Sequence, residues 1–239
     1  MANNPPGSAP SQALVSRRES GIWKPVVVAE SKKWLGILKV RLQSAGKNSL
    51  VLVYSGFATI NDSTFSALFV SRSVDGGSTW SASKVLRKLP PPAMPLLGGL
   101  HRTTDGTLHL IWTLEATETG GATEVFHEIS RDGGNTWESM KPIPALSKFD
   151  FLLSAQLGDR IVVTVRGSDA LLAQALIGGT IGFQLVSSLK ASGLPVNIVR
   201  SGTALETTWA LFEGVATTDK KKIGTAIVPH SVTTNIRCH

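Results

Sequence analysis

Short runs of β-forming residues, separated by turn residues, make up most of the 239-residue chain. The runs are about five to eight residues long, which is the usual length of a strand. Gly, Asp and Pro mark their ends, for example at Asp105-Gly106 and Gly158-Asp159. No segment of useful length has the period of an amphipathic helix. The pattern therefore predicts an all-β fold of short antiparallel strands.

The predicted strands fall into about four successive units. Strands of the first unit are expected at residues 37–42, 49–54, 65–72 and 83–87, and those of the second at 96–103, 107–114, 123–129 and 141–143. Strands of the third unit are expected at 151–157, 160–166, 171–177 and 181–187, and those of the fourth at 196–200, 205–212 and 222–228. The fourth unit lacks one strand, which the apolar run at 26–30 could supply.

An eight-residue motif occurs twice, each time directly after a β-rich run. We call the copies the first box (residues 73–80) and the second box (residues 130–137). They read Ser73-Val74-Asp75-Gly76-Gly77-Ser78-Thr79-Trp80 and Ser130-Arg131-Asp132-Gly133-Gly134-Asn135-Thr136-Trp137. Asp132 follows Asp75 by 57 residues, close to the length of a propeller blade with generous loops. The repetition predicts that both boxes have the same role in successive units.

The residue types of the box suit a self-contained turn between two strands. Glycine accepts the positive φ angles that tight hairpin turns need. The aspartate carboxylate can accept hydrogen bonds from backbone N–H groups of its own turn, and the Ser and Thr hydroxyls can hold the same loop. The tryptophan adds a large apolar surface at the start of the next strand. A structural role is therefore enough to explain the box.

Both boxes match the pattern S-x-D-x-G-x-T-W at every specified position. In this they resemble the Asp-box of the sialidase-like propellers, also called BNR-repeat proteins. The resemblance implies a β-propeller of four-stranded antiparallel blades, in which the box joins the third and fourth strands at the periphery. It implies a structural role for the motif residues Ser73, Asp75, Gly77, Thr79, Trp80, Ser130, Asp132, Gly134, Thr136 and Trp137. This family has six blades, so about four blades would form a compact or an incomplete propeller.

The beginning of the sequence differs in composition from the rest. Residues 1–22 are rich in Pro, Ser, Asn and Ala and include a polar run at 16–20. We expect a disordered leader there and an Asp-box β-propeller domain over residues 23–239. The sequence contains neither the apolar stretch of a secretory signal nor a run of about 18 apolar residues. We expect a soluble protein without a membrane span, cytoplasmic by default and exported if the N-terminus is incomplete.

The formal net charge of +7 favours anionic partners. We expect a glycan or an acidic protein as ligand. Nucleic acid is not expected, because the only dense basic run, residues 220–222, lacks interleaved aromatic residues. No metal or other cofactor is expected, since the single Cys238 and the histidines lack zinc-ligand spacing. His109 and His127 alternate with apolar residues, so we expect them to face solvent or to pair across strands.

The resemblance also suggests candidate catalytic residues. Retaining sialidases hold the substrate carboxylate with three arginines, use a tyrosine paired with a glutamate as nucleophile, and use an aspartate as acid/base. Arg41, on the first strand of the first unit, and Asp62, in a loop of that unit, match the places of one arginine and of the aspartate. Read without the resemblance, Arg41 is an exposed strand residue and Asp62 belongs to an ordinary Asn-Asp-Ser turn.

Arg166, Arg200 and Glu206 complete the candidate set as substrate-binding residues in the third and fourth units. The sequence departs from the family pattern at other points. The Ile-Pro that follows the family arginine is absent after Arg41. Tyr54, the only tyrosine, falls on a first-unit strand, whereas the family's nucleophile comes from a late blade.

Three functional hypotheses follow from these features. We favour a sialidase-like propeller that binds a glycan or a protein at its central face without hydrolysing it, because intact boxes accompany an incomplete catalytic set. The second hypothesis is an exo-sialidase-type glycoside hydrolase, truncated or divergent, that acts on sialosides. The third is a basic assembly scaffold for an acidic partner.

Overall fold

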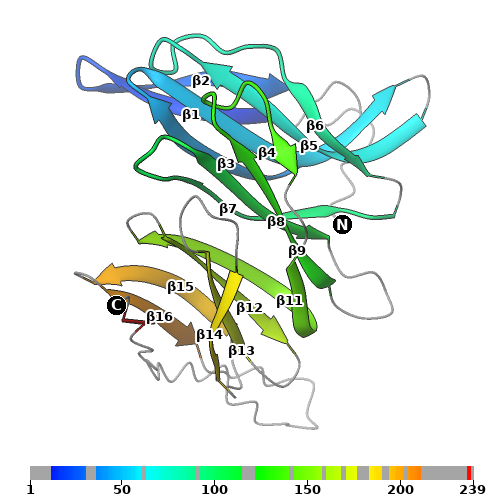
Figure 1. The fold of residues 1–239 in the computed structure, drawn as a ribbon. Coiled ribbons are helices and arrows are strands. Elements are labelled where there is room, and N and C mark those ends of the chain that lie inside the picture. Colours follow the sequence, from blue (N-terminus) through cyan, green and yellow to red (C-terminus); the bar gives the residue numbers. More distant parts are fainter. Residues whose placement is uncertain are drawn as a thin grey trace, which may run out of the picture. The chain divides into compact units, whose positions relative to one another are not determined.

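The computed structural model consists of antiparallel strands joined by turns and loops (Figure 1). It describes residues 12–30, 36–60, 63–89, 92–114, 122–139, 143–157, 160–167, 171–176, 183–189, 194–201, 204–210 and 236–237. Beyond residue 139 it describes side chains at Leu152, Ser154, Gln156, Ile161 and Val163. The chain divides into two compact units, Met1–Pro144 and Ala145–His239. Within the described ranges, no helix is long and apolar enough to cross a membrane.

The first unit contains a hairpin and two sheets. Its described strands are β1 (Gln12–Glu19), β2 (Ile22–Glu30), β3 (Ile37–Gly46), β4 (Ser49–Ile60), β5 (Ser63–Ser73), β6 (Lys84–Leu89), β7 (Pro95–Arg102), β8 (Leu108–Leu114), β9 (Ala122–Ser130) and β10 (Glu138–Ser139). β1 and β2 form the hairpin. β3, β4, β5 and β6 pair in order as the first sheet. β7, β8, β9 and β10 pair in order as the second sheet. All of these pairings are antiparallel.

The second unit repeats this sheet pattern. Its strands are β11 (Ile143–Leu157), which starts at the end of the first unit, β12 (Arg160–Gly167), β13 (Leu171–Leu176), β14 (Phe183–Leu189), β15 (Leu194–Ser201), β16 (Ala204–Ala210) and β17 (Ile236–Arg237). β11 to β14 pair in order as an antiparallel sheet. β16 pairs with β15 and β17, also antiparallel.

The successive groups β3–β6, β7–β10 and β11–β14, each of four antiparallel strands, confirm the predicted all-β fold class. Most predicted strands overlap the corresponding observed ones. The fourth strand of the second sheet is the exception: it is β10, directly after the second box, whereas it was predicted at residues 141–143, and Ile143 begins β11. The predicted strand at 222–228 lies outside the described residues.

The first sheet has an apolar core on each of its faces. Alternate residues of β4 and β5 point to opposite faces, as the period of a strand requires. One face packs on the second sheet, and the buried residues there are Val51, Val53, Leu68, Val70, Leu97, Leu100, Leu108, Leu110 and Trp112. The other face packs on the hairpin, and the buried residues there are Ala13, Val15, Val28, Leu52, Tyr54, Phe65, Ala67 and Phe69. Figure 1 shows this order of hairpin, first sheet and second sheet.

The hairpin occupies part of the range in which a disordered leader was expected. β1 pairs with β2 along its length, and its residues Ala13 and Val15 are buried on the first sheet. Ser20 and Gly21 connect the strands with φ angles of 48° and 87°, as a two-residue hairpin turn requires. The expectation of disorder is therefore wrong for residues 12–22, because a Ser-Gly turn joins two strands that can bury apolar side chains. Residues 1–11 lie outside the described residues.

The apolar run at 26–30 does not complete the fourth unit. It lies in β2, where Val26 is opposite Val15 and Ala29 is opposite Ala13. Val28 is buried with these side chains against the first sheet. The run therefore covers one face of the first sheet, because its apolar residues find their partners on the neighbouring strand β1.

A buried ion pair ties the two sheets of the first unit together. Glu128 on β9 has a side-chain exposure of 3%, and its carboxylate accepts hydrogen bonds from Arg87 Nε at 2.9 Å and Arg87 Nη2 at 2.5 Å. Ser139 donates to the same carboxylate at 2.9 Å and also contacts the guanidinium. Arg87 lies on β6, so the pair joins the last strand of the first sheet to β9. Removal of one partner of a buried ion pair is strongly destabilising, because the other charge is left uncompensated.

Removal of Arg87 tests this connection. We expect Arg87→Ala to lower the free energy of unfolding by about 3 kcal/mol, because the buried Glu128 loses its cation. Arg131→Ala is the matched control, since Arg131 pairs with Glu138 at the surface, where both side chains are more than half exposed. That loss should stay below about 1 kcal/mol. Urea unfolding measures both values, and equal losses would contradict the role assigned to the buried pair.

Candidate functional site

The first box forms a closed turn between β5 and β6. The Asp75 carboxylate accepts hydrogen bonds from Thr79 N at 2.9 Å, from Thr79 Oγ1 at 2.6 Å and from Ser73 Oγ at 2.8 Å. Ser73 Oγ accepts a bond from Gly77 N at 2.8 Å. Trp80 Nε1 donates to Gly77 O at 3.3 Å. The five specified motif residues therefore belong to one hydrogen-bonded network.

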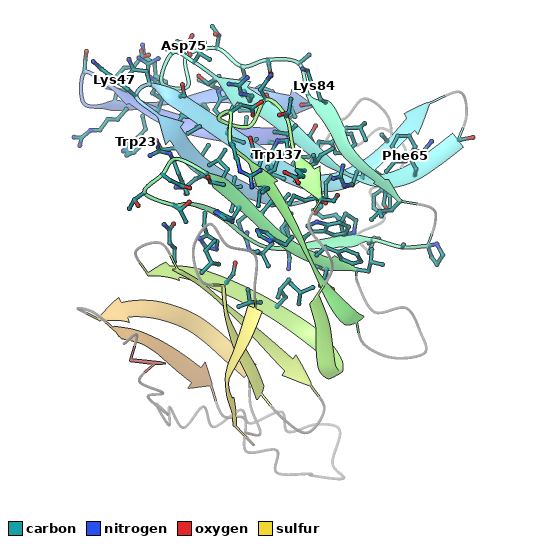
Figure 2. The ribbon with its side chains drawn as sticks, viewed as in Figure 1. Trp23, Lys47, Phe65, Asp75, Lys84 and Trp137 are labelled. Carbon is teal, nitrogen blue, oxygen red and sulfur yellow. The ribbon has the colours of Figure 1, made fainter. Side chains whose placement is uncertain are left out.

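The second box repeats the same bonds between the same motif positions. Asp132 accepts from Thr136 N at 2.9 Å, from Thr136 Oγ1 at 2.6 Å and from Ser130 Oγ at 2.9 Å. Gly134 N donates to Ser130 Oγ at 2.8 Å, and Trp137 Nε1 donates to Gly134 O at 3.1 Å. Both aspartates thus serve as acceptors for their own loops. Figure 2 labels Asp75 of the first box and Trp137 of the second.

These hydrogen bonds favour the ionised form of each carboxyl group. The side-chain and backbone bonds from Thr79 lower the pKa of Asp75 far below its usual value. Burial acts in the opposite direction at Asp132, yet the bonds from Thr136 and Ser130 lower the pKa of that carboxyl to about 2. Both groups are therefore charged at neutral pH and remain strong acceptors.

Both boxes pack closely on β4. Gly77 has a φ of +89°, and a Cβ there would lie 3.2 Å from Leu50 Cδ1. Gly134 has a φ of +85°, and a Cβ there would lie 2.6 Å from Val51 Cγ2. Glycine alone satisfies both the backbone angle and the approach at Gly134. The second box therefore docks on a strand of the first sheet and sets the spacing between the two sheets.

Arg72 is a residue that the motif did not single out. It lies on β5, and its guanidinium donates to Gly133 O at 2.9 Å and to Asn135 Oδ1 at 3.2 Å. It thereby joins the end of β5 to the loop of the second box. Ile129 precedes the second box in the place that Arg72 takes before the first. Because the repeat does not extend to this position, comparison of the two copies could not reveal the cation.

Arg41 links the first strands of the two sheets. Its Nη2 donates to Leu97 O on β7 at 3.1 Å, and its Nη1 donates to Val40 O at 3.0 Å. The side chain is partly buried, and this burial lowers the pKa of Arg41 from its ordinary value. Two carbonyl groups therefore hold the guanidinium of Arg41 in place. Without the resemblance, the sequence had predicted an exposed strand residue at this position.

The structure describes less of the other four candidate site residues. Asp62 lies outside the described residues. Arg166 lies on β12, Arg200 on β15 and Glu206 on β16, all in the second unit, and the structure describes their backbone alone. Arg200 is opposite Leu205 in the strand register, whereas Glu206 is opposite Val199, so the two candidates are not register partners.

Tyr54 lies in the core between the first sheet and the hairpin. It is 7% exposed, and its ring stacks on Phe69 with 4.9 Å between the centroids. Burial raises the pKa of Tyr54, which disfavours the phenolate. Its hydroxyl is therefore poorly suited to attack a substrate.

Three histidines lie on neighbouring strands of the second sheet. His109 Nδ1 and His127 Nε2 are 3.1 Å apart, and the two rings stack. Both residues are buried, so they pair across strands and the alternative of solvent exposure is wrong. Burial lowers the pKa of His101 to about 4 and that of His127 to about 3. In the part of the chain that the structure describes, no three His, Cys, Asp or Glu residues are grouped to hold a metal.

Comparison with known families and with curated proteins yields no match. Several solved structures are similar. One is a protein of unknown function from Dyadobacter fermentans DSM 18053, with 16% identity and a TM-score of 0.60 over 83% of this chain and 64% of that one. Another is an α-L-arabinofuranosidase from Fusarium graminearum in complex with an iminosugar inhibitor, with 13% identity and a TM-score of 0.52 over 78% of this chain and 59% of that one.

A third similar structure is the Trypanosoma rangeli sialidase in complex with the inhibitor DANA, with 14% identity and a TM-score of 0.50 over 81% of this chain and 38% of that one. The chain thus covers less than two thirds of each of these three proteins. At such identities the similarity concerns the fold. The chain has the four-stranded antiparallel sheets of β-propeller-type proteins.

Alanine at two box glycines tests the docking of the second box. Gly134 and Gly76 both have positive φ angles, of +85° and +68°, so either substitution should cost about 1–2 kcal/mol of stability. At Gly134 the new Cβ also meets Val51, which should add about 1–3 kcal/mol. At Gly76 no atom lies within 4 Å. We expect urea unfolding to show the larger loss for Gly134→Ala, and equal losses would contradict the close approach.

Acid should lower the free energy of unfolding, because the buried histidines resist protonation in the folded state. An unfolded histidine takes up a proton near pH 6.5, whereas folded His101 and His127 do so only near pH 4 and pH 3. Between these values the unfolded state binds more protons, so the free energy of unfolding falls as the pH falls from about 7 to 4. We expect His127→Gln to make this fall shallower in urea unfolding at several pH values. The same slope in both proteins would contradict the assignment.

Proposed function

We propose that the chain is a sialidase-like Asp-box propeller that binds a glycan without hydrolysing it. Its fold is similar to those of a sialidase and an α-L-arabinofuranosidase, both glycosidases by name. The two boxes supply the hydrogen-bonded loops that the Asp-box resemblance implies. Proteins of one fold have many functions, so the proposal depends on the side chains of Tyr54 and Arg41.

The burial of Tyr54 carries the non-hydrolytic part of the proposal. A retaining sialidase needs an accessible tyrosine that a neighbouring base can activate. Tyr54 is the only tyrosine in this sequence, and it stacks on Phe69 in the core. Burial also raises its pKa. A glycan bound to the described surface therefore meets no tyrosine placed to attack it.

Arg41, on β3, is the proposed glycan contact. Two carbonyl groups orient its guanidinium, and the remaining N–H donors can bind a carboxylate or hydroxyl group. A side chain that is already held in place loses little entropy when a ligand binds. Asp62, Arg166, Arg200 and Glu206 remain proposed further contacts of the same ligand.

The charge of the chain supports a second candidate function. With 24 basic and 17 acidic residues, the protein would attract an acidic protein partner and could act as an assembly scaffold. Such attraction weakens as salt screens the charges. It therefore predicts association that is strong at low ionic strength and lost at high ionic strength.

Binding and hydrolysis assays on the same preparation test the proposed function. We expect saturable binding to at least one carboxylated glycan on a glycan array and no release of fluorophore from methylumbelliferyl sialosides or arabinofuranosides. Arg41→Ala should weaken the binding about tenfold, which corresponds to one charge-assisted contact. Lys39→Ala, at an exposed position two residues earlier on β3, is the control and should bind normally.

Three other outcomes would contradict the proposal. Fluorophore release that Asp62→Ala abolishes would support the exo-sialidase alternative. Salt-sensitive recovery of an acidic protein without any glycan binding would support the scaffold. Equal weakening by Arg41→Ala and Lys39→Ala would contradict the placement of the ligand at Arg41.

A further inference from the structure

A groove of about 340 Å³ opens between the two boxes of the first unit. Its wall is formed by side chains of β5, the first box, the start of β6 and the tip of the second box. They include Arg72, Val74, Trp80, Lys84 and Asn135. The volume lies at the lower end of the range of small-ligand sites, which is about 300–1,000 Å³. A mono- or disaccharide has a suitable size, and Arg41 is not part of this wall.

Two cations give the groove a positive charge. Arg72 is fixed by its bonds to Gly133 O and Asn135 Oδ1, and neither bond uses its Nη2. Lys84 is exposed at the start of β6. Among the described residues, the ion pairs are formed by other cations than these two. An anionic ligand could therefore contact both side chains without displacing a carboxylate.

The carboxylates of the boxes do not compete for these cations. Asp75 and Asp132 are absent from the groove wall. Each accepts hydrogen bonds from the Ser and Thr side chains of its own loop. The negative charge of each box is thus directed to its own loop. The polar groups of the groove wall are the two cations, hydroxyl groups and the Asn135 amide.

Apolar surface accompanies the polar groups. Trp80 lines the groove with part of its ring, while the rest packs on the core between the first sheet and the hairpin. Its indole N–H is already bonded to Gly77 O, so it offers a ligand an apolar contact. Val74, also on the wall, is 69% exposed. A sugar ring has apolar C–H groups as well as hydroxyl groups, and it binds well where an aromatic surface lies beside a few hydrogen-bonding groups.

We propose that this groove is a second glycan site, selective for a sugar that carries a carboxylate or sulfate group. Arg72 and Lys84 bind the anionic group, Trp80 and Val74 contact the ring, and the Asn135 amide binds a hydroxyl group. The site is formed by the pair of boxes and is separate from the contact proposed at Arg41. Its existence does not require that the Arg41 site binds a ligand.

Titration with digalacturonate and with its dimethyl ester tests the proposal, because the two probes differ in charge and hardly in shape. We expect digalacturonate to bind at least about tenfold more tightly than the ester, since an ionic contact is lost. Lys84→Gln should weaken digalacturonate binding about fivefold. Lys47→Gln is the matched control, because Lys47 is exposed at the β3–β4 turn and lies well apart from Lys84 in Figure 2.

A further variant and a competing anion distinguish the groove from the Arg41 site and a sugar site from a simple anion site. The comparison of Lys84→Gln with its control is repeated in an Arg41→Ala background, where a ligand at the site of the proposed function no longer contributes. The loss on Lys84→Gln should persist there, which separates the two sites. Equal affinity for acid and ester, or equal effects of Lys84→Gln and Lys47→Gln, would overturn the proposal. Inorganic sulfate that binds as tightly as digalacturonate would also overturn it, because the groove would then recognise an anion and not a sugar.

Discussion

The approach of Gly134 to Val51 is the contact on which the rest of the first unit depends. A positive φ and a backbone that lies against a valine side chain place the second box directly on β4. Arg72 then reaches the carbonyl of Gly133 and the side chain of Asn135. The two sheets share an apolar core behind this contact. The second box is therefore a turn within the second sheet, and it also positions that sheet on the first.

Among the described side chains, the polar groups that could suggest catalysis stabilise the fold. The box aspartates accept bonds from their own loops, Arg41 donates to backbone carbonyls, and Tyr54 fills a hydrophobic core. Glu128 is paired with a cation from the other sheet. The groups that remain for a ligand line the groove between the two boxes. These observations are the basis of the proposal that the chain recognises a glycan without hydrolysing it.

The sequence predicted the strands well, because turn residues and alternation are local signals. The boxes were visible for the same reason: their hydrogen bonds join residues within five positions of one another. Long-range contacts left no such signal. The docking of Gly134 on Val51, the pair of Arg87 with Glu128 and the groove at Arg72 all join segments that are far apart along the chain. The hairpin at β1 was missed because a polar composition hid its alternating buried residues.

Amide hydrogen exchange at the boxes tests the central claim most directly. The N–H groups of Gly77, Thr79, Gly134 and Thr136 lie in loops but donate to Ser and Asp side chains. If each box is a closed network, and the second box also holds its sheet against the first, these amides should exchange as slowly as those of the central strands β4 and β8. Exchange at the rate of an open loop would contradict it.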